Sequence, residues 1–180
     1  EPVPPYRQLI DQSIKGRTIG VMPSLLDGVS PAIAEAYRTC QSALASLGAT
    51  FSEVALPHHT HSVGAYYVIA PAECSANLAR YDGVRFGHRC ENPRDLQDLY
   101  LRSREEGFGD EVKRRILVGT FALSAGYYDA YYNKAQQVRR LIQADFISAL
   151  EDVDMILFPT TPATAFQLGE NISDPVSMYL

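Results

Sequence analysis

Three histidines stand within four residues of one another, at His58, His59 and His61. Imidazole nitrogens are common zinc ligands, but a zinc site also needs ligands elsewhere in the chain at a recognisable spacing. The three cysteines and the carboxylates of this sequence show no such spacing. We therefore interpret the histidine run as a solvated loop and expect no metal site in this chain.

Arginine and tyrosine offer a second kind of chemistry, the binding of an anionic ligand. Arg114 and Arg115 follow Glu111 in a helical pattern, and Glu111 can pair with either of them at i+3 or i+4. Adjacent helical residues point about 100° apart, so only one of the two guanidinium groups can face a ligand. Tyr66 and Tyr67 present the same choice on another predicted helix.

The segment from Arg80 to Gly87 holds two arginines, two aromatic residues and two glycines. Arg80 and Asp82 are candidate ligand contacts there, because a guanidinium group binds carboxylates and phosphates and glycine permits a close backbone approach. The alternative is a structural turn with arginine–aspartate pairing, and on the residues alone we favour that turn.

Two i, i+4 pairs of tyrosines stand at Tyr127, Tyr128, Tyr131 and Tyr132. A stacking platform for nucleobases is conceivable, but acidic residues outnumber basic ones by 21 to 16. We prefer tyrosines that bridge core and water. No GxSxG nucleophile turn and no GxGxxG or GxxxxGKS/T phosphate loop occurs in the sequence.

Strands and helices alternate in the first part of the chain. Apolar runs predict strands at 17–22, 49–56 and 155–158; helical spacing predicts helices at 31–47, 62–81, from Asn92-Pro93 to Gly107, 111–123 and 125–151, before a final loop from 160 to 180. Ser30 is the expected N-cap of the first long helix and Gly48 the residue that ends it. The pattern is that of an α/β fold with a parallel pair of strands.

The chain has 180 residues, no initiator methionine and no polar tail, so both ends look cut. Three strands are few for this much helix, which indicates that strands are missing. We expect residues 1–180 to be part of a single domain, with 1–15 linker-like. No apolar run reaches the ~18 residues of a membrane span, and we see no signal peptide and no disulfide pattern. A cytoplasmic protein without membrane contact is the expectation.

Long strings of this sequence resemble a known family. They are residues 66–87 (YYVIAPAECSANLARYDGVRFG), 111–120 (EVKRRILVGT) and 124–132 (SAGYYDAYY), with further similarity at 103–109 and 159–166. They are similar to the A subunits of the bacterial glutamyl-tRNA(Gln)/aspartyl-tRNA(Asn) amidotransferases, which are amidase-signature enzymes. The resemblance implies a partial α/β/α fold with a mixed central sheet covered by helices.

The resemblance also implies a function for the whole enzyme. Such A subunits release ammonia from glutamine with a Ser, a cis-Ser and a Lys, which lie N-terminal to the region seen here. This chain therefore holds no catalytic residue of that mechanism and should be inactive alone. The ammonia passes to a B subunit that uses ATP and Mg²⁺ and makes most of the tRNA contacts, and a small C subunit completes the complex. No cofactor is expected in this chain.

Two glutamine-binding positions carry over from the family, Tyr66 and Arg115. Tyr67, Arg114, Arg80 and Asp82 are weaker candidates. The family's third substrate contact, an aspartate, would follow Leu180. Two alternatives remain open, a noncatalytic binding or interaction module and a part of a general amidase that acts on small amides.

Overall fold

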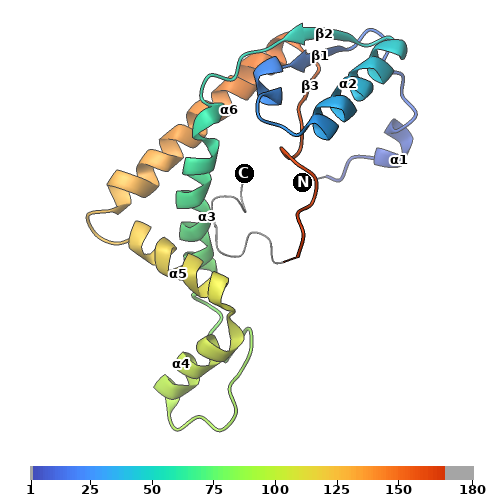
Figure 1. Cartoon of the computed structure of the whole chain (residues 1–180). Coiled ribbons are helices and arrows are strands. Elements are labelled where there is room, and N and C mark those ends of the chain that lie inside the picture. Colours follow the sequence, from blue (N-terminus) through green and yellow to red (C-terminus); the bar gives the residue numbers. More distant parts are fainter. Residues whose placement is uncertain (1, 169–180) are drawn as a thin grey trace. The chain divides into compact units, whose positions relative to one another are not determined.

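The computed structural model describes residues 2–168. Its elements are α1 (Tyr6–Leu9), β1 (Thr18–Val21), the turn η1 (Pro23–Leu26), α2 (Pro31–Ser46), β2 (Thr50–Glu53), the turn η2 (His59–His61), α3 (Ser62–Leu78), α4 (Leu96–Gly107), α5 (Asp110–Ala122), the π-helix η3 (Tyr128–Asn133), α6 (Lys134–Asp152) and β3 (Met155–Leu157) (Figure 1). The chain divides into two compact units. Among the described residues, one unit holds 2–57 and 144–168, and the other holds 58–143.

The first unit contains a three-stranded parallel sheet in the order β2-β1-β3. The central strand β1 pairs with both neighbours, and its Ile19 lies opposite Phe51 and Met155 and is only 1% exposed. Gly20 allows β1 to lie close to its surroundings, because a Cβ there would stand 2.9 Å from the Val54 side chain. The α/β class and the parallel pair predicted from the sequence are confirmed.

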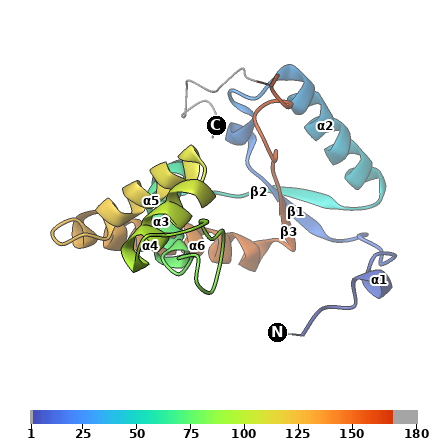
Figure 2. The same ribbon diagram turned by 90° about the horizontal axis from the view of Figure 1, so that it is seen from below.

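Helix α2 belongs to this unit and begins as the sequence predicts (Figure 2). The Ser30 hydroxyl accepts a hydrogen bond from the Ile33 N–H, and Gly48 ends the helix with φ +92°. The Tyr37 hydroxyl donates to the Leu157 carbonyl at 3.2 Å, which ties α2 to the end of β3. An apolar cluster on this unit consists of Met22, Leu56 and Ala149, with Leu25, Val54, Phe146 and Ile156 packed against it.

Helices α3 and α5 pack side by side in the second unit (Figure 1, Figure 2). Gly119 is buried at their contact, and a Cβ on it would lie 1.9 Å from the Pro71 carbonyl oxygen. Only glycine fits at this point of α5. One residue further along, the hydroxyls of Thr120 and Ser75 are 2.9 Å apart. The close approach fixes which residues of the two helices meet.

Two predicted boundaries are wrong. The helix expected from Asn92-Pro93 begins at Leu96, because Asn92 has a left-handed φ of 49° and Asp95 is the extended N-cap, whose carboxylate accepts the Asp98 N–H at 2.8 Å. The single helix expected over 125–151 is interrupted, since η3 precedes α6.

The remaining predicted elements lie within a few residues of the observed ones. The last part of the predicted final loop, from 169 to 180, lies outside the described residues. Within 2–168 no helix is both long and apolar enough to cross a membrane.

Candidate functional site

Arg115 and Tyr66 meet where α5 lies against α3. The Arg115 Nη1 donates to the Tyr66 hydroxyl oxygen at 3.2 Å, across 49 positions of the chain. Arg115 stands on the helical face of α5 that also carries Gly119 and Ala122, both of which are buried. The packing of α5 therefore turns Arg115 toward α3.

Arg114 points in a different direction from Arg115, as expected for neighbouring residues that are rotated by about 100° in an α-helix. Its side chain is 64% exposed, against 27% for Arg115. The prediction that one of these neighbours stays in solvent while the other is more enclosed is confirmed by this difference. The structure thus brings Arg115 to Tyr66 and leaves Arg114 at the surface.

Glu111 contacts both arginines from the first turn of α5. Its Oε1 accepts from the Arg115 Nε at 3.0 Å, and its Oε2 accepts from the Arg114 Nη1 at 2.6 Å. The hydrogen bond to Tyr66 raises the pKa of Arg115, partial burial opposes this, and the bond to Glu111 raises it further. Arg115 is therefore a permanent cation held at two of its nitrogens.

Tyr67 lies beside the arginine–tyrosine pair. Its ring meets that of Tyr66 edge to face, with the centroids 5.7 Å apart. Burial raises the pKa of Tyr67, so its hydroxyl stays protonated at neutral pH. The structure therefore places both tyrosines near α5, and the Tyr66 hydroxyl accepts the 3.2 Å hydrogen bond from Arg115.

Arg80 and Asp82 lie in a turn that follows α3. The Asp82 carboxylate accepts from the backbone N–H groups of Val84 and Arg85, at 2.8 and 3.3 Å, which lowers the pKa of Asp82. Arg80 is exposed. The segment therefore forms a structural turn, in which the Asp82 carboxylate contacts the backbone and the nearby Arg85 charge adds to the lowering of its pKa. A ligand role for either residue stays a prediction.

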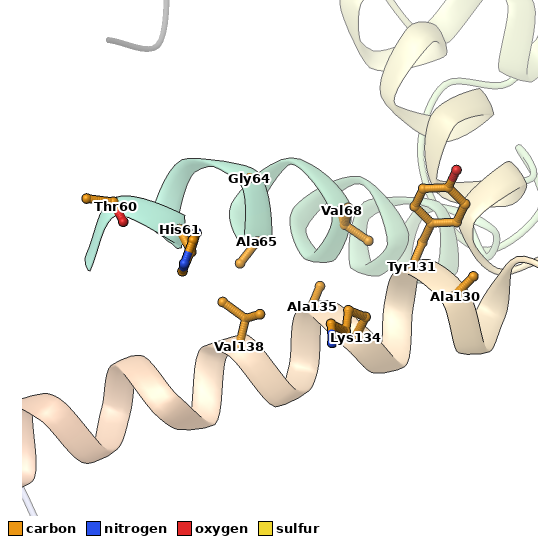
Figure 3. A pocket seen from close by; sticks show the side chains of 10 residues that line it. All are labelled: Thr60, His61, Gly64, Ala65, Val68, Ala130, Tyr131, Lys134, Ala135 and Val138. Carbon is orange, nitrogen blue, oxygen red and sulfur yellow. The ribbon is translucent and has the colours of Figure 1, made fainter. Parts of the chain in front are cut away.

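A hollow of about 320 Å³ lies between the start of α3 and the start of α6, within the second unit (Figure 3). Small apolar side chains such as Ala65, Ala135 and Val138 form much of its wall, and His61 and Lys134 supply ionisable groups. Among residues 2–168, no three or more His, Cys, Asp or Glu side chains come together as metal ligands. The hollow is lined by neither Tyr66 nor Arg115.

The tyrosines near η3 contact one another and α5. The ring centroids of Phe121 and Tyr127 are 4.2 Å apart, and those of Tyr127 and Tyr131 are 5.9 Å apart. On α3, the Glu73 carboxylate accepts from the Tyr132 hydroxyl at 2.8 Å, and this contact raises the pKa of Tyr132. These contacts agree with tyrosines that bridge packing and solvent.

The fold joins a small parallel sheet to helices, two of which hold an enclosed arginine beside a tyrosine hydroxyl. The amidase family profile matches residues 1–180, and the chain belongs to this family. The crystal structure of an amidase that is 23% identical covers 88% of this chain with a TM-score of 0.62, which supports the fold.

The more specific similarity is to one kind of amidase-family protein, the A chain of glutamyl-tRNA(Gln) amidotransferases. This sequence is 60% identical to the protein of that name from Hahella chejuensis and 58% identical to the one from Pseudomonas fluorescens, over 99% and 100% of its length. It spans 37% and 38% of those relatives. The crystal structure of the corresponding protein from Thermotoga maritima is 38% identical, with a TM-score of 0.66, over 96% of this chain and 32% of that one.

Proposed function

We propose that this chain is part of the A subunit of a glutamine-dependent tRNA amidotransferase and contributes Tyr66 and Arg115 to its glutamine site. The contact between these two side chains is the observation that carries the site, because residues 49 positions apart are joined at 3.2 Å. The names of the relatives at about 60% identity support the assignment of the subunit.

The chemistry of glutamine suits this pair. Its α-carboxylate is a planar anion, which a guanidinium group binds with parallel hydrogen bonds. Arg115 supplies the cation, and the Tyr66 hydroxyl can orient the ligand beside it. The α-ammonium group needs an acidic partner, and we assign that role to an aspartate expected to follow Leu180.

The whole protein would hydrolyse the side-chain amide of glutamine, and the ammonia would convert Glu-tRNA(Gln) or Asp-tRNA(Asn) to the amidated form. We assign the Ser, cis-Ser and Lys of that step to a segment outside this chain, so the chain alone is expected to be inactive. ATP and Mg²⁺ would act on the B subunit, which would also hold most of the tRNA, and a C subunit would join them in the cytoplasm.

The test compares two neighbouring substitutions in the full-length A subunit within its complex. Arg115→Ala removes a charged contact that is typically worth ~2 kcal/mol or more, so the KM for glutamine should rise at least about 30-fold. Arg114→Ala, the matched control, should leave that KM within about twofold, since its side chain is 64% exposed. Unchanged glutamine kinetics for Arg115→Ala would reject the site.

The class of reaction has its own assay. The complex should transfer ammonia from glutamine to misacylated Glu-tRNA(Gln) or Asp-tRNA(Asn) in the presence of ATP. Hydrolysis of small amides without any transfer would instead identify a general amidase. The 180-residue chain alone should release no ammonia from glutamine, and release by the purified chain would refute its assigned inactivity.

A further inference from the structure

We propose that Glu111 is a positioning residue, which holds the guanidinium plane of Arg115 in the orientation that receives the α-carboxylate of glutamine. This inference rests on the proposed function and names a further residue of the same site. The helical spacing of Glu111 predicts a pair with either arginine and by itself indicates no role in binding.

Two hydrogen bonds at different nitrogens fix the plane of Arg115. Nε is bound to Glu111 at 3.0 Å and Nη1 to the Tyr66 hydroxyl at 3.2 Å. A guanidinium group anchored at two nitrogens and at its own side chain cannot rotate freely. Without Glu111, the Nε anchor is lost and the guanidinium plane is held less firmly.

The Glu111 carboxylate is itself fixed from its other side. Arg114 binds Oε2 at 2.6 Å while Arg115 binds Oε1, so each oxygen has an arginine partner. Arg114 therefore contacts the oxygen of Glu111 that the Arg115 Nε does not use. Because an exposed ion pair is weak, we expect the loss of Arg114 to be tolerated.

Electrostatics distinguishes a positioning role from a direct attraction. Glu111 is acidic, and near Arg115 its charge opposes the binding of an anionic carboxylate. Any benefit of Glu111 to glutamine binding must then come from geometry. In the Glu111→Gln variant, the side-chain carbonyl of residue 111 can still accept from the Arg115 Nε, and the opposing negative charge is gone. This variant should therefore preserve the binding of the substrate glutamine.

The experiment measures glutaminase kinetics of four variants in the full-length A subunit within its complex. Glu111→Ala should raise the KM for glutamine by about 10- to 100-fold, with kcat changed less than about threefold, because misplacement of a binding group costs effects of this size. Glu111→Gln should restore the KM to within about threefold of the parent. Arg115→Ala reports on the proposed function.

Asp110→Ala is the matched control. Asp110 stands beside Glu111 in the first turn of α5, but its carboxylate is 99% exposed and its ion pair, at 3.9 Å, is with Lys113. The Asp110→Ala substitution removes a negative charge from the same turn and leaves the contacts of Glu111 with Arg114 and Arg115 in place. Its KM should stay at the parental value, whereas a purely helix-stabilising role of the acidic turn would make it resemble Glu111→Ala.

A second readout uses the α-amide of L-glutamine, which keeps the reacting side-chain amide and lacks the carboxylate charge. The parent should prefer glutamine, and Glu111→Ala should lose most of that preference. Parental KM and preference for Glu111→Ala, or a Glu111→Gln variant as impaired as Glu111→Ala, would overturn the positioning role. If Arg115→Ala also behaves as the parent, the proposed glutamine site itself is rejected.

Discussion

Two carboxylates of the second unit each lie between two arginines, Asp98 in α4 and Glu111 in α5. Asp98 is 6% exposed, and its partners Arg94 and Arg102 are 84% and 38% exposed. Glu111 is 51% exposed, while Arg115 is only 27% exposed. The α4 cluster encloses its anion and the α5 cluster encloses its cation. Arg115 is the cation that we propose binds an anionic ligand, whereas Asp98 is the enclosed anion of a local ion-pair cluster in α4.

The α4 cluster is also complete in itself. The Asp98 carboxylate accepts from the backbone N–H and the guanidinium group of Arg94, and Arg102 extends the contacts to Glu106 at 2.9 Å. His88 binds the other oxygen of Glu106. All of these partners come from a short stretch of chain around one helix. The α5 cluster depends instead on a second helix, because Tyr66 belongs to α3.

The largest expected effect comes from breaking the helix contact on which only the α5 cluster depends. Gly119→Ala places a Cβ 1.9 Å from the Pro71 carbonyl, so α3 and α5 must move apart, at a cost of about 3 kcal/mol in the free energy of unfolding. Urea unfolding of the purified protein measures this cost.

Gly64→Ala in α3 is the control for that substitution. No heavy atom outside the neighbouring backbone lies within 4 Å of a Cβ at Gly64, so alanine should stabilise by about 0.5–1 kcal/mol. Equal effects of the two substitutions would contradict the tight contact at Gly119.

A second prediction concerns acid and the enclosed anion. The Arg94 side chain and backbone lower the pKa of Asp98 from 3.8 to about 2. Asp98 therefore stabilises the fold above its ordinary pKa, and this contribution is lost as the pH falls from 3.8 toward 2. Asp98→Asn should lower the Tm at neutral pH, with a difference from the parent that shrinks across that range.

Glu111→Gln gives the contrast, since Glu111 is half exposed. At neutral pH, the Tm of Glu111→Gln should differ from that of the parent by less than the Tm of Asp98→Asn does. Thermal unfolding at several pH values compares the two variants, and an Asp98→Asn difference that does not change with pH would refute the assigned ionisation.

The third effect is smaller and concerns the hydroxyl that the α5 cluster receives from α3. Tyr66→Phe removes one hydrogen-bond partner of Arg115 and keeps the ring, so the KM for glutamine should rise about three- to tenfold. Tyr67→Phe should change it less. Initial-rate kinetics of the full-length complex measure the KM for glutamine of both variants. A larger rise for Tyr67→Phe than for Tyr66→Phe would assign the binding role to Tyr67 instead.

The smallest expected effect is on the exposed side of the α5 cluster. Arg114→Ala removes an i, i+3 ion pair of a side chain that is 64% exposed, and the free energy of unfolding should change by no more than about 0.5 kcal/mol. Chemical denaturation measures it. A loss of several times that size would show that Arg114 is structural, as the arginines around Asp98 are.

Local signals made much of this structure predictable. Ser30 and Gly48 mark the ends of α2, and the rotation between neighbouring helical residues predicted that only one of Arg114 and Arg115 could face a ligand. The choice of Arg115 came from the family resemblance. Which tyrosine meets Arg115 came from the family resemblance, because the sequence alone left Tyr66 and Tyr67 equivalent.

Gly119 escaped prediction because its role depends on a contact between distant residues. Gly119 stands among helix-forming residues as an ordinary weak point, and only its approach to Pro71 explains it. The burial of Asp98 was not predicted either, although its partners Arg94 and Arg102 lie only four residues away on either side. The start of α4 was missed because Asn92-Pro93 resembles a helix start, while the capping carboxylate belongs to Asp95.

The π-helix η3 has a consequence for everything that follows it in α6. An extra residue in a continuous α-helix rotates the subsequent side chains by about 100°, whereas a π-turn takes up about one residue more than an α-turn within a single turn. Tyr132 lies inside η3, and its hydroxyl reaches the Glu73 carboxylate from there. A one-residue deletion within 128–133 that converts the π-turn to an α-turn therefore removes the extra residue and leaves Lys134 and Ala135 in nearly the same rotational phase. The chain can lose one residue in η3 with less disturbance of α6 than in an ordinary α-turn.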